Sequence, residues 1–209
     1  AQVVDFADVV FLAVKPQFLE GVLDEIRDSV KAGQIFISIA PGKTLQWLGE
    51  RLGENTKVIR TMPNTPAMVG EGMTALCVNE LVTEEETALA VKLCDTFGKT
   101  EVIPEHLMDA VVGVSGSSPA YVFMFLEAMA DAAVADGMPR AQAYKFAAQS
   151  VLGSAKLMQE TGKHPGELKD MVCSPAGTTI QAVRVLEEKG FRSAVIEAQT
   201  ECVKKAKGM

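Results

Sequence analysis

Short hydrophobic runs alternate with helical patterns over the first half of the chain. Residues 9–14 form a continuous apolar run closed by Lys15 and Pro16, which is typical of a strand buried on both faces of a parallel sheet. From Phe18 to Val30 the apolar positions follow one stripe of a helix. The same patterns predict strands over 34–39, 57–61, 74–78 and 99–103, a helix over 45–52, and a helix that Thr83 and Glu86 open as a capping box and Gly98 closes. This alternation predicts an α/β architecture over residues 1–104.

After Pro104 the strand pattern stops, and the rest of the chain is expected to be all-α. Gly and Pro separate predicted helices over 106–112, 119–136, 139–161, 166–172, 178–189 and 191–207. Met124, Phe125, Met129 and Phe146 are expected to fill the gaps between these helices. Largely apolar helices would expose too much surface alone, so we expect residues 105–209 to pair with a second copy.

Composition and charge exclude several classes of protein. The chain has 209 residues, of which 48% are hydrophobic and 22% charged, as in a globular protein. Its net charge of -7 gives no basic face for nucleic acid. The most apolar stretch, 120–135, contains Glu127 and Asp131, and no stretch has the ~20 uninterrupted apolar residues of a membrane helix, so we expect a soluble protein. The four scattered cysteines and two histidines show no zinc-ligand spacing, which favours a reduced, cytoplasmic setting and no metal.

Three turns follow predicted strands at the edge where open α/β sheets bind ligands. They span residues 13–16, 39–42 and 60–66, and their small residues and prolines would let a flat ligand lie across them. For the first turn the alternative is an ordinary strand-to-helix connection with Lys15 in solvent.

Two loops rich in Ser, Gly and Thr, 113–119 and 174–179, each enter a predicted helix. Backbone N–H groups and the helix dipole could hold a small carboxylate there, assisted by the hydroxyls of Ser174, Thr178 or Thr179. The alternative is that these residues only cap helices. His106 and His164 are expected at the surface or at helix ends, and Cys173 is expected to be a small buried residue. The sequence shows no Ser-His-Asp set and no paired carboxylates, so an enzyme built on it would need little acid–base machinery.

Five segments resemble, in order and spacing, the pyrroline-5-carboxylate reductase family along the whole chain. They are residues 11–16, 60–66, 115–121, 164–170 and 174–180, the last continuing through Ala182, Leu186 and Glu187. The resemblance implies an oxidoreductase that reduces the imine of 1-pyrroline-5-carboxylate to L-proline with NAD(P)H, the last step of proline biosynthesis. It also implies a truncated Rossmann-like NAD(P)-binding sheet over 1–104 and a helical dimerisation and substrate-binding domain over 105–209. The protein would be a cytoplasmic homodimer or a larger homo-oligomer built on dimers.

The resemblance also assigns roles to individual residues. The cofactor, NADP (NADPH) or NAD (NADH), would contact the strand ends at Ala13, Val14, Lys15, Pro16, Ile39, Ala40 and Pro41, with Met62, Pro63 and Asn64 near the nicotinamide. The substrate would lie at Ser174, Gly177, Thr178 and Thr179, and Thr179 would supply the catalytic hydroxyl near the imine nitrogen. A protonated imine is already electrophilic, so hydride transfer needs positioning rather than a strong base.

The chain departs from the family pattern at its beginning. The resemblance starts after the family's first strand, its Gly-x-Gly-x-x-Gly turn and its second strand, and no such glycine fingerprint occurs in the chain. The chain opens at Ala1 with neither an initiator methionine nor a signal peptide. We therefore expect either a fragment of a longer gene product or a form that is not a working dehydrogenase. A polypeptide of residues 1–209 alone is expected to bind a nicotinamide dinucleotide weakly or not at all.

Two alternatives stand beside the reductase. A β-hydroxyacid dehydrogenase-like enzyme would need a lysine where this chain has Val122 and an asparagine where it has Leu126. A non-catalytic helical dimerisation module is favoured by the missing glycine turn and disfavoured by the intact loop 174–179.

Overall fold

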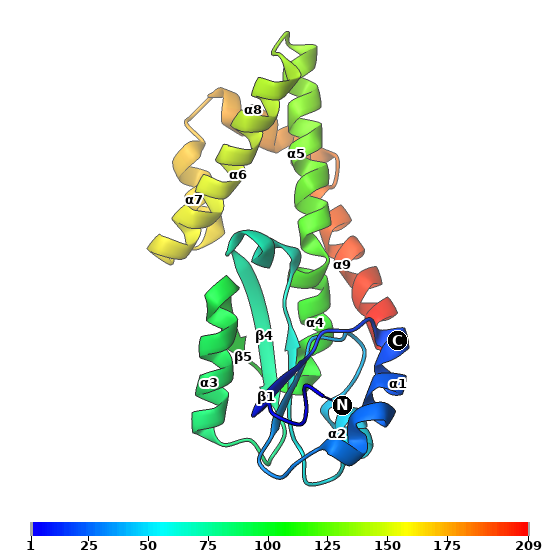
Figure 1. Ribbon diagram of the computed structural model, residues 1–209. Helices are drawn as coiled ribbons and strands as arrows, with labels where there is room; N and C mark the ends of the chain where they lie inside the picture. Colours follow the sequence, from blue (N-terminus) through cyan, green and yellow to red (C-terminus); the bar gives the residue numbers. More distant parts are fainter. Residues whose placement is uncertain (1, 209) are drawn as a thin grey trace. The chain divides into compact units, whose positions relative to one another are not determined.

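The computed structural model describes residues 2–208 (Figure 1). The chain divides into two compact units. The first comprises Ala1–Pro119 together with Gln199–Met209, and the second comprises Ala120–Ala198. The α/β and then all-α order expected from the sequence is confirmed, while the functional boundary between residues 104 and 105 stays a prediction.

A five-stranded sheet, in the order β1-β2-β3-β4-β5, forms the centre of the first unit. Its strands are β1 (Val9–Leu12), β2 (Ile35–Ser38), β3 (Lys57–Met62), β4 (Gly72–Val78) and β5 (Gly98–Val102). Every neighbouring pair is parallel except β3 and β4, which run antiparallel. The expected Rossmann-like parallel sheet is confirmed, with one reversed pair that the sequence did not predict. Between β3 and β4 lies the short 3-10 turn η2 (Thr65–Val69) and no crossover helix, and a parallel connection needs such a crossover.

Strand β1 differs from the prediction in burial and in length, since it covers Val9–Leu12 rather than residues 9–14. It lies at the edge of the sheet, where Phe11 is 43% exposed, whereas every residue of β2 is buried. Within residues 2–208, the expectation that residues 9–14 are buried on both faces is not met at Phe11 and Ala13, which are exposed.

Helices cover both faces of the sheet. On one face α1 (Pro16–Ile26), continued by η1 (Arg27–Ser29), and α2 (Leu45–Leu52) bury Leu23 and Leu48 against Phe36. On the other face lies α3 (Glu84–Cys94), whose Ala90 packs with Ile37 and Leu76. Figure 1 shows α3 and α1 on opposite sides of the strands.

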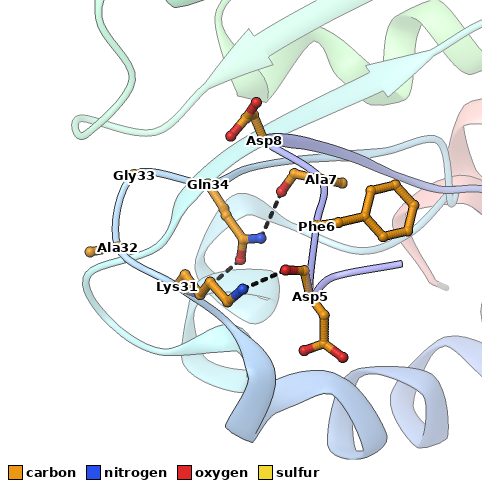
Figure 2. Close-up of a pocket in the computed structure, with 8 residues that line it drawn as sticks. All are labelled: Asp5, Phe6, Ala7, Asp8, Lys31, Ala32, Gly33 and Gln34. Atoms are coloured by element: carbon orange, nitrogen blue, oxygen red, sulfur yellow. Dashed lines mark hydrogen bonds between the residues drawn. The ribbon is translucent and has the colours of Figure 1, made fainter. Parts of the chain in front are cut away.

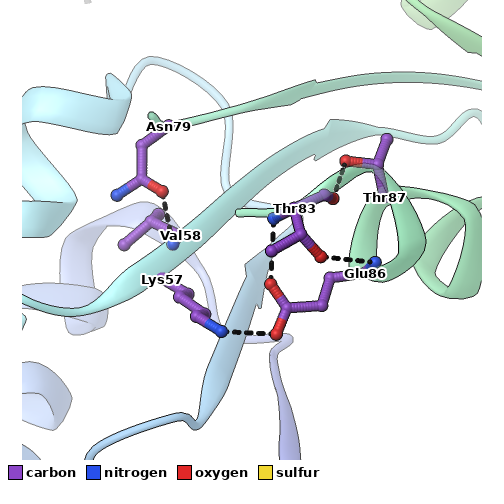
Figure 3. Close-up of polar contacts among 6 residues, drawn as sticks. All are labelled: Lys57, Val58, Asn79, Thr83, Glu86 and Thr87. Carbon is purple, nitrogen blue, oxygen red and sulfur yellow. Dashed lines mark hydrogen bonds and ion pairs between the residues drawn. The ribbon is translucent and has the colours of Figure 1, made fainter. Parts of the chain in front are cut away.

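The sequence predicted the start of α3 correctly but not its end. The capping box is present: the Thr83 hydroxyl accepts a hydrogen bond from the Glu86 N–H, and the Glu86 carboxylate accepts one from the Thr83 N–H (Figure 3). Lys57 of β3 donates to the same carboxylate. Gly98 does not close this helix, because the 3-10 turn η3 (Asp95–Phe97) intervenes and Gly98 begins β5.

A glutamine holds the first residues of the chain against the sheet. Gln34 Nε2 donates hydrogen bonds to the backbone oxygens of Val4 (2.6 Å) and Ala7 (2.7 Å), as the close-up in Figure 2 shows for Ala7. Val4 is buried among the residues under α1. The segment before β1 is thereby part of the core.

All the segments after β5 are helical. They are η4 (Glu105–Leu107), α4 (Met108–Val111), the π-helical turn η5 (Val112–Gly116), α5 (Ser118–Ala135), α6 (Arg140–Thr161), α7 (Pro165–Val172), α8 (Thr178–Glu188) and α9 (Phe191–Lys207). The loop predicted over 113–119 is largely the π-helical turn η5, which leads through Ser117 into α5 at Ser118. The Ser117 N–H is not a spare donor, because it donates to the Val112 oxygen at 2.8 Å.

The second unit buries few of its own side chains. Throughout Ala120–Ala198, all of which the structure describes, the buried residues are Ala130, Ala143 and Ala147. Met124 is 69% exposed and Phe146 68%, so the expectation that they fill gaps between helices is wrong within a single chain. The reason is that these helices turn their large apolar side chains outward, as a surface that is covered by another molecule does.

An apolar groove of about 940 Å³ runs between α5, α8 and α9 of this unit. Tyr121, Phe125 and Leu186 line it, together with Phe191, whose ring centroid is 6.1 Å from that of Phe125. The helical stretch Glu105–Ala135 has 31 residues, and its most apolar 18-residue window has a mean hydropathy of 1.2 and is 6% buried. By length and composition this stretch could cross a bilayer. A single helix of this kind is weak evidence for a membrane.

Candidate active site

The predicted cofactor turns meet at one edge of the sheet. In the parallel register Leu12 of β1 pairs with Ser38 of β2, so these two strands end together, and Ser38 pairs with Arg60 of β3, which continues to Met62 at the same edge. Hydrogen bonds lock these ends: the Ile39 N–H donates to the Leu12 oxygen, and the Thr61 hydroxyl donates to the Ser38 oxygen at 3.1 Å. The turns beginning at Ala13, Ile39 and Met62 therefore leave the sheet side by side.

The individual residues of this edge differ in exposure. Ala13 and Lys15 are exposed, Ala40 is buried, and the others are half-buried, namely Val14, Pro16, Ile39, Pro41, Met62, Pro63 and Asn64. Pro16 is the first residue of α1, and Lys15 is its N-cap without a side-chain cap hydrogen bond. Small side chains on two neighbouring turns leave the edge open to a flat ligand.

A partly buried ion pair links β3 and the start of α2 to the helical segment that follows the sheet. The Arg60 side chain, 9% exposed, places Nη1 3.0 Å from Oε1 of Glu105 in η4. The same oxygen accepts a hydrogen bond from the Leu45 N–H, at the start of α2, at 2.7 Å. No sequence pattern relates Arg60 to Glu105, although an arginine inside an apolar strand indicates that a buried partner exists.

Cys77 lies opposite Arg60 in the register of β4. Burial raises the pKa of its thiol to about 12, with the Glu105 carboxylate adding to the rise and Arg60 opposing it. A thiol with such a pKa is protonated at neutral pH, so it is not a nucleophile.

Asn64 is fixed by two segments that are distant in sequence. Its Nδ2 donates to the backbone oxygen and to Oγ of Ser115, each at 3.2 Å, and its Oδ1 accepts from the Met73 N–H at 2.9 Å. Ser115 belongs to the π-helical turn η5. The sequence analysis treated residues 60–66 and 113–119 as separate loops, whereas the structure brings them into contact.

The predicted substrate loop connects α7 and α8 in the second unit. Ala176 adopts φ 57°, a left-handed conformation that is uncommon for residues other than glycine and often found at functional sites. Gly177 is the N-cap of α8, its N–H donating to the Ser174 oxygen at 3.0 Å. A Cβ on Gly177 would lie 2.3 Å from Ser174 Oγ, so a larger residue there would require that hydroxyl to rotate away.

The N-cap of α8 is Gly177, which has no side chain to cap the helix. The substrate-binding roles of Ser174, Thr178 and Thr179 stay predictions beside the alternative that these residues only cap helices. Ser174 and Thr178 are exposed, and Thr179 and Gly177 are half-buried. The first N–H groups of α8 and three nearby hydroxyls are therefore available to a ligand, and a helix N-terminus favours an anion.

The remaining candidates have structural places. His164 caps α7 by accepting a hydrogen bond from the Gly166 N–H at 3.1 Å, and His106 is exposed in η4, as expected. Cys173 is half-buried rather than buried, because it ends α7 beside an exposed loop. Over residues 2–208 no group of three or more His, Cys, Asp or Glu side chains could hold a metal ion.

The strand-end edge fits the nicotinamide half of a dinucleotide better than the pyrophosphate half. Pyrophosphate is usually held by a glycine-rich turn between a strand and a helix. The single Gly-x-Gly pair of the chain, Gly70 and Gly72, instead ends η2 and begins β4. Within residues 2–208 no strand-to-helix turn has that composition. Weak dinucleotide binding by residues 1–209 alone stays a prediction.

Comparison with known proteins decides the family. Residues 105–209 match the model described as pyrroline-5-carboxylate reductase dimerisation, and residues 1–42 match that of NADP oxidoreductase, coenzyme F420-dependent. The pyrroline-5-carboxylate reductase of Escherichia coli (strain K12) is 62% identical over 205 residues, which cover 98% of this chain and 76% of the relative. The chain belongs to the pyrroline-5-carboxylate reductase family.

Other members of the reductase family agree. The pyrroline-5-carboxylate reductase of Methanosarcina acetivorans is 47% identical over 95% of this chain and 73% of its own. The solved reductase of Coxiella burnetii has a TM-score of 0.93 and 36% identity over 99% of this chain and 77% of its own. The Plasmodium falciparum pyrroline carboxylate reductase, solved with NADP bound, has a TM-score of 0.91 and 30% identity over 99% of this chain and 79% of its own. These matches decide against the β-hydroxyacid dehydrogenase-like alternative.

Proposed function

We propose that this chain reduces 1-pyrroline-5-carboxylate, with the strand-end turns binding the cofactor and the loop 174–179 binding the substrate. The activity follows from the family: the protein is an NAD(P)H-dependent oxidoreductase of proline biosynthesis that reduces the imine to L-proline. One observation carries the site assignment. The N-terminus of α8, whose N-cap is Gly177, and the hydroxyls of Ser174, Thr178 and Thr179 form a concentrated set of donors in the loop where the family resemblance expects the substrate.

The residues divide the chemistry between them. Bound NAD(P)H supplies the hydride. The turns at Ala13, Ala40 and Met62 would hold the nicotinamide flat against the sheet edge, where small side chains leave room for it. The N–H groups at the start of α8, with Ser174 and Thr178, would hold the substrate carboxylate.

Thr179 has the role closest to the reaction. The protonated imine N–H would donate a hydrogen bond to the Thr179 hydroxyl oxygen, which holds the C=N bond in one orientation while the carbon accepts hydride. Orientation of this kind is sufficient because the iminium needs no further activation. No residue in this scheme has to act as a strong acid or base.

The chain forms homo-oligomers, and we propose that the basic assembly is a dimer. The three buried alanines of the second unit and its apolar groove support this, because a stable helical unit needs more buried surface than one copy provides. A second copy would also cover the apolar stretch Glu105–Ala135, which carries Glu127 and Asp131 and so suits a protein interface better than lipid.

The remaining assignments complete the proposal. We propose functional domains over 1–104 and 105–209, supported by a dimerisation model that begins at residue 105. A cytoplasmic location is supported by four free cysteines, Cys77, Cys94, Cys173 and Cys202. The net charge of -7 supports the absence of a nucleic-acid partner.

Substitution of Thr179 tests the site assignment. In the protein expressed from its gene, Thr179→Ala is expected to lower kcat on the order of 10–100-fold, because one hydrogen bond that matters most in the transition state is lost. Circular dichroism should show an unchanged fold. The control is Thr178→Ala, which should raise the KM for 1-pyrroline-5-carboxylate with a smaller change in kcat. Unchanged kinetics in Thr179→Ala would contradict the assignment.

A further inference from the structure

The side chain of Asn64 uses its amide group inside the protein. A carboxamide offers one NH₂ group and one oxygen. Nδ2 donates to both oxygens of Ser115, and Oδ1 accepts from the Met73 N–H at the start of β4. The backbone oxygen of Asn64 accepts as well, from the Ala67 N–H at 3.1 Å. Asn64 therefore joins three segments, and its amide points toward the protein on both sides.

The π-helical turn η5 also contacts the other end of the same loop. A Cβ on Gly116 would lie 2.9 Å from Met62 Cε, so the Met62 methyl group rests on the backbone of this turn. Met62 and Asn64, the two ends of the predicted nicotinamide loop, thus both rest on η5. Turns of π-helix are rare and are frequently found at functional sites.

Helix α9 supports η5 from behind. A Cβ on Gly113 would lie 2.7 Å from Gln199 Cγ and 3.1 Å from Val203 Cγ2, so α9 packs directly on the backbone of the turn. Ser117, one residue beyond the turn, places its Oγ 3.0 Å from Sγ of Cys202 on α9. All these residues belong to the first unit. The backbone of η5 is therefore packed between α9 and the loop 62–64.

We propose that Asn64 is a positioning residue, which holds the nicotinamide loop at a set height on η5 through Ser115 and does not contact the cofactor with its amide group. This inference rests on the proposed function, since it assumes that residues 62–64 lie beside the nicotinamide. Small displacements of a positioning loop cost much in hydride transfer, where donor and acceptor must be aligned. Ser115 thereby becomes part of the nicotinamide site without touching the cofactor.

The substitution Asn64→Asp isolates this role. Aspartate keeps the oxygen that accepts from the Met73 N–H, but it replaces the NH₂ donor by a second oxygen, which is repelled by the backbone oxygen of Ser115 and can only accept from its hydroxyl. Ser115→Ala is a milder companion, because it removes Oγ and leaves the backbone oxygen in place. Both changes weaken the hydrogen bonds between Asn64 and Ser115, and neither adds a larger side chain at the strand-end edge.

The chain contains a matched control at the opposite end of β3. Asn79 makes the same pair of bonds as Asn64: its Nδ2 donates to the Thr56 oxygen at 2.9 Å, and its Oδ1 accepts from the Val58 N–H at 3.2 Å, the bond drawn in Figure 3. Asn79→Asp therefore removes the equivalent hydrogen bond, from Nδ2 to the Thr56 oxygen, at a place remote from the strand-end turns. It controls for loss of stability alone.

The readout compares two ligands that differ only in the nicotinamide. NADPH and 2′-phospho-ADP-ribose, which lacks the nicotinamide, are titrated calorimetrically into the protein expressed from its gene. We expect Asn64→Asp to weaken NADPH binding about tenfold and binding of the analogue less than about twofold. Asn79→Asp should leave both affinities unchanged while lowering the melting temperature by a similar amount. Ser115→Ala should show the same selectivity with a smaller loss, and it decides the matter if Asn64→Asp does not fold.

The outcomes separate this proposal from the one on which it rests. Equal loss for the two ligands, or loss of NADPH affinity in Asn79→Asp as large as in Asn64→Asp, would overturn the positioning role alone. Failure of the unsubstituted protein to bind NADPH more tightly than the analogue would instead overturn the placement of the nicotinamide at residues 62–64, and this proposal with it.

Discussion

Removal of the Glu105 carboxylate should destabilise the first unit more than any exposed ion pair would. In Glu105→Ala, Arg60 Nη1 and the Leu45 N–H lose the oxygen that both now use, at 3.0 and 2.7 Å. Breaking a buried pair from one side costs ~3–5 kcal/mol, whereas exposed pairs contribute at most ~1 kcal/mol.

The exposure of the two side chains sets the size of this effect. Arg60 is 9% exposed, but Glu105 is 32% exposed, so water can partly replace the lost carboxylate. We therefore take about 2 kcal/mol for the arginine, below the fully buried value, and add about 1 kcal/mol for the Leu45 hydrogen bond. The expected loss in the free energy of unfolding is about 3 kcal/mol.

Urea denaturation of two single variants and one double variant measures this loss. The matched control is Glu20→Ala, which breaks the exposed pair with Arg51, where the side chains are 59% and 27% exposed. It should cost less than about 1 kcal/mol. Adding Arg60→Met to Glu105→Ala should restore part of the stability, because no unpaired charge is then buried. A cost for Glu105→Ala no larger than for Glu20→Ala, or a further loss on adding Arg60→Met, would refute the reasoning.

Two further predictions concern the backbone of the sheet and the assembly. Gly98→Ala should lower the free energy of unfolding by more than about 3 kcal/mol, because its Cβ would lie 2.0 Å from the Gly72 oxygen. The control is Gly21→Ala in α1, which has no atom within 4 Å of the added Cβ and should be neutral or slightly stabilising. Equal denaturation curves for the two variants would contradict the importance of the close approach at Gly98. The protein expressed from its gene should sediment as a dimer or larger at micromolar concentration, and Met124→Glu should shift it toward smaller species; a stable monomer with full helix content would contradict the dimer.

The sequence predicted the elements whose signals are local. Thr83 and Glu86 marked the start of α3, and the apolar run of β2 marked a strand that is buried throughout. The meeting of the turns at Ala13, Ile39 and Met62 also followed from the sequence, because strands of a parallel sheet end at a common edge.

Other features depend on contacts between distant segments. Arg60 and Glu105 are 45 positions apart, and no periodicity relates them. A stretch rich in Gly and Ser is compatible with a loop as well as with a π-helical turn, so composition does not predict η5. In the structure α9 packs on Gly113 of this turn, a contact between segments that are distant in sequence. The inward direction of the Asn64 amide could not be predicted either, since it depends on Ser115 and on the start of β4.

The most direct test of the central claim is the balance between cofactor consumed and product formed. The protein expressed from its gene is mixed with NADPH and 1-pyrroline-5-carboxylate, absorbance follows the cofactor, and chromatography measures L-proline. The account predicts oxidation of NADPH only when 1-pyrroline-5-carboxylate is present, with one L-proline formed for each NADPH consumed, and a much slower rate in Thr179→Ala. Oxidation without proline, or no substrate-dependent oxidation at all, would contradict it.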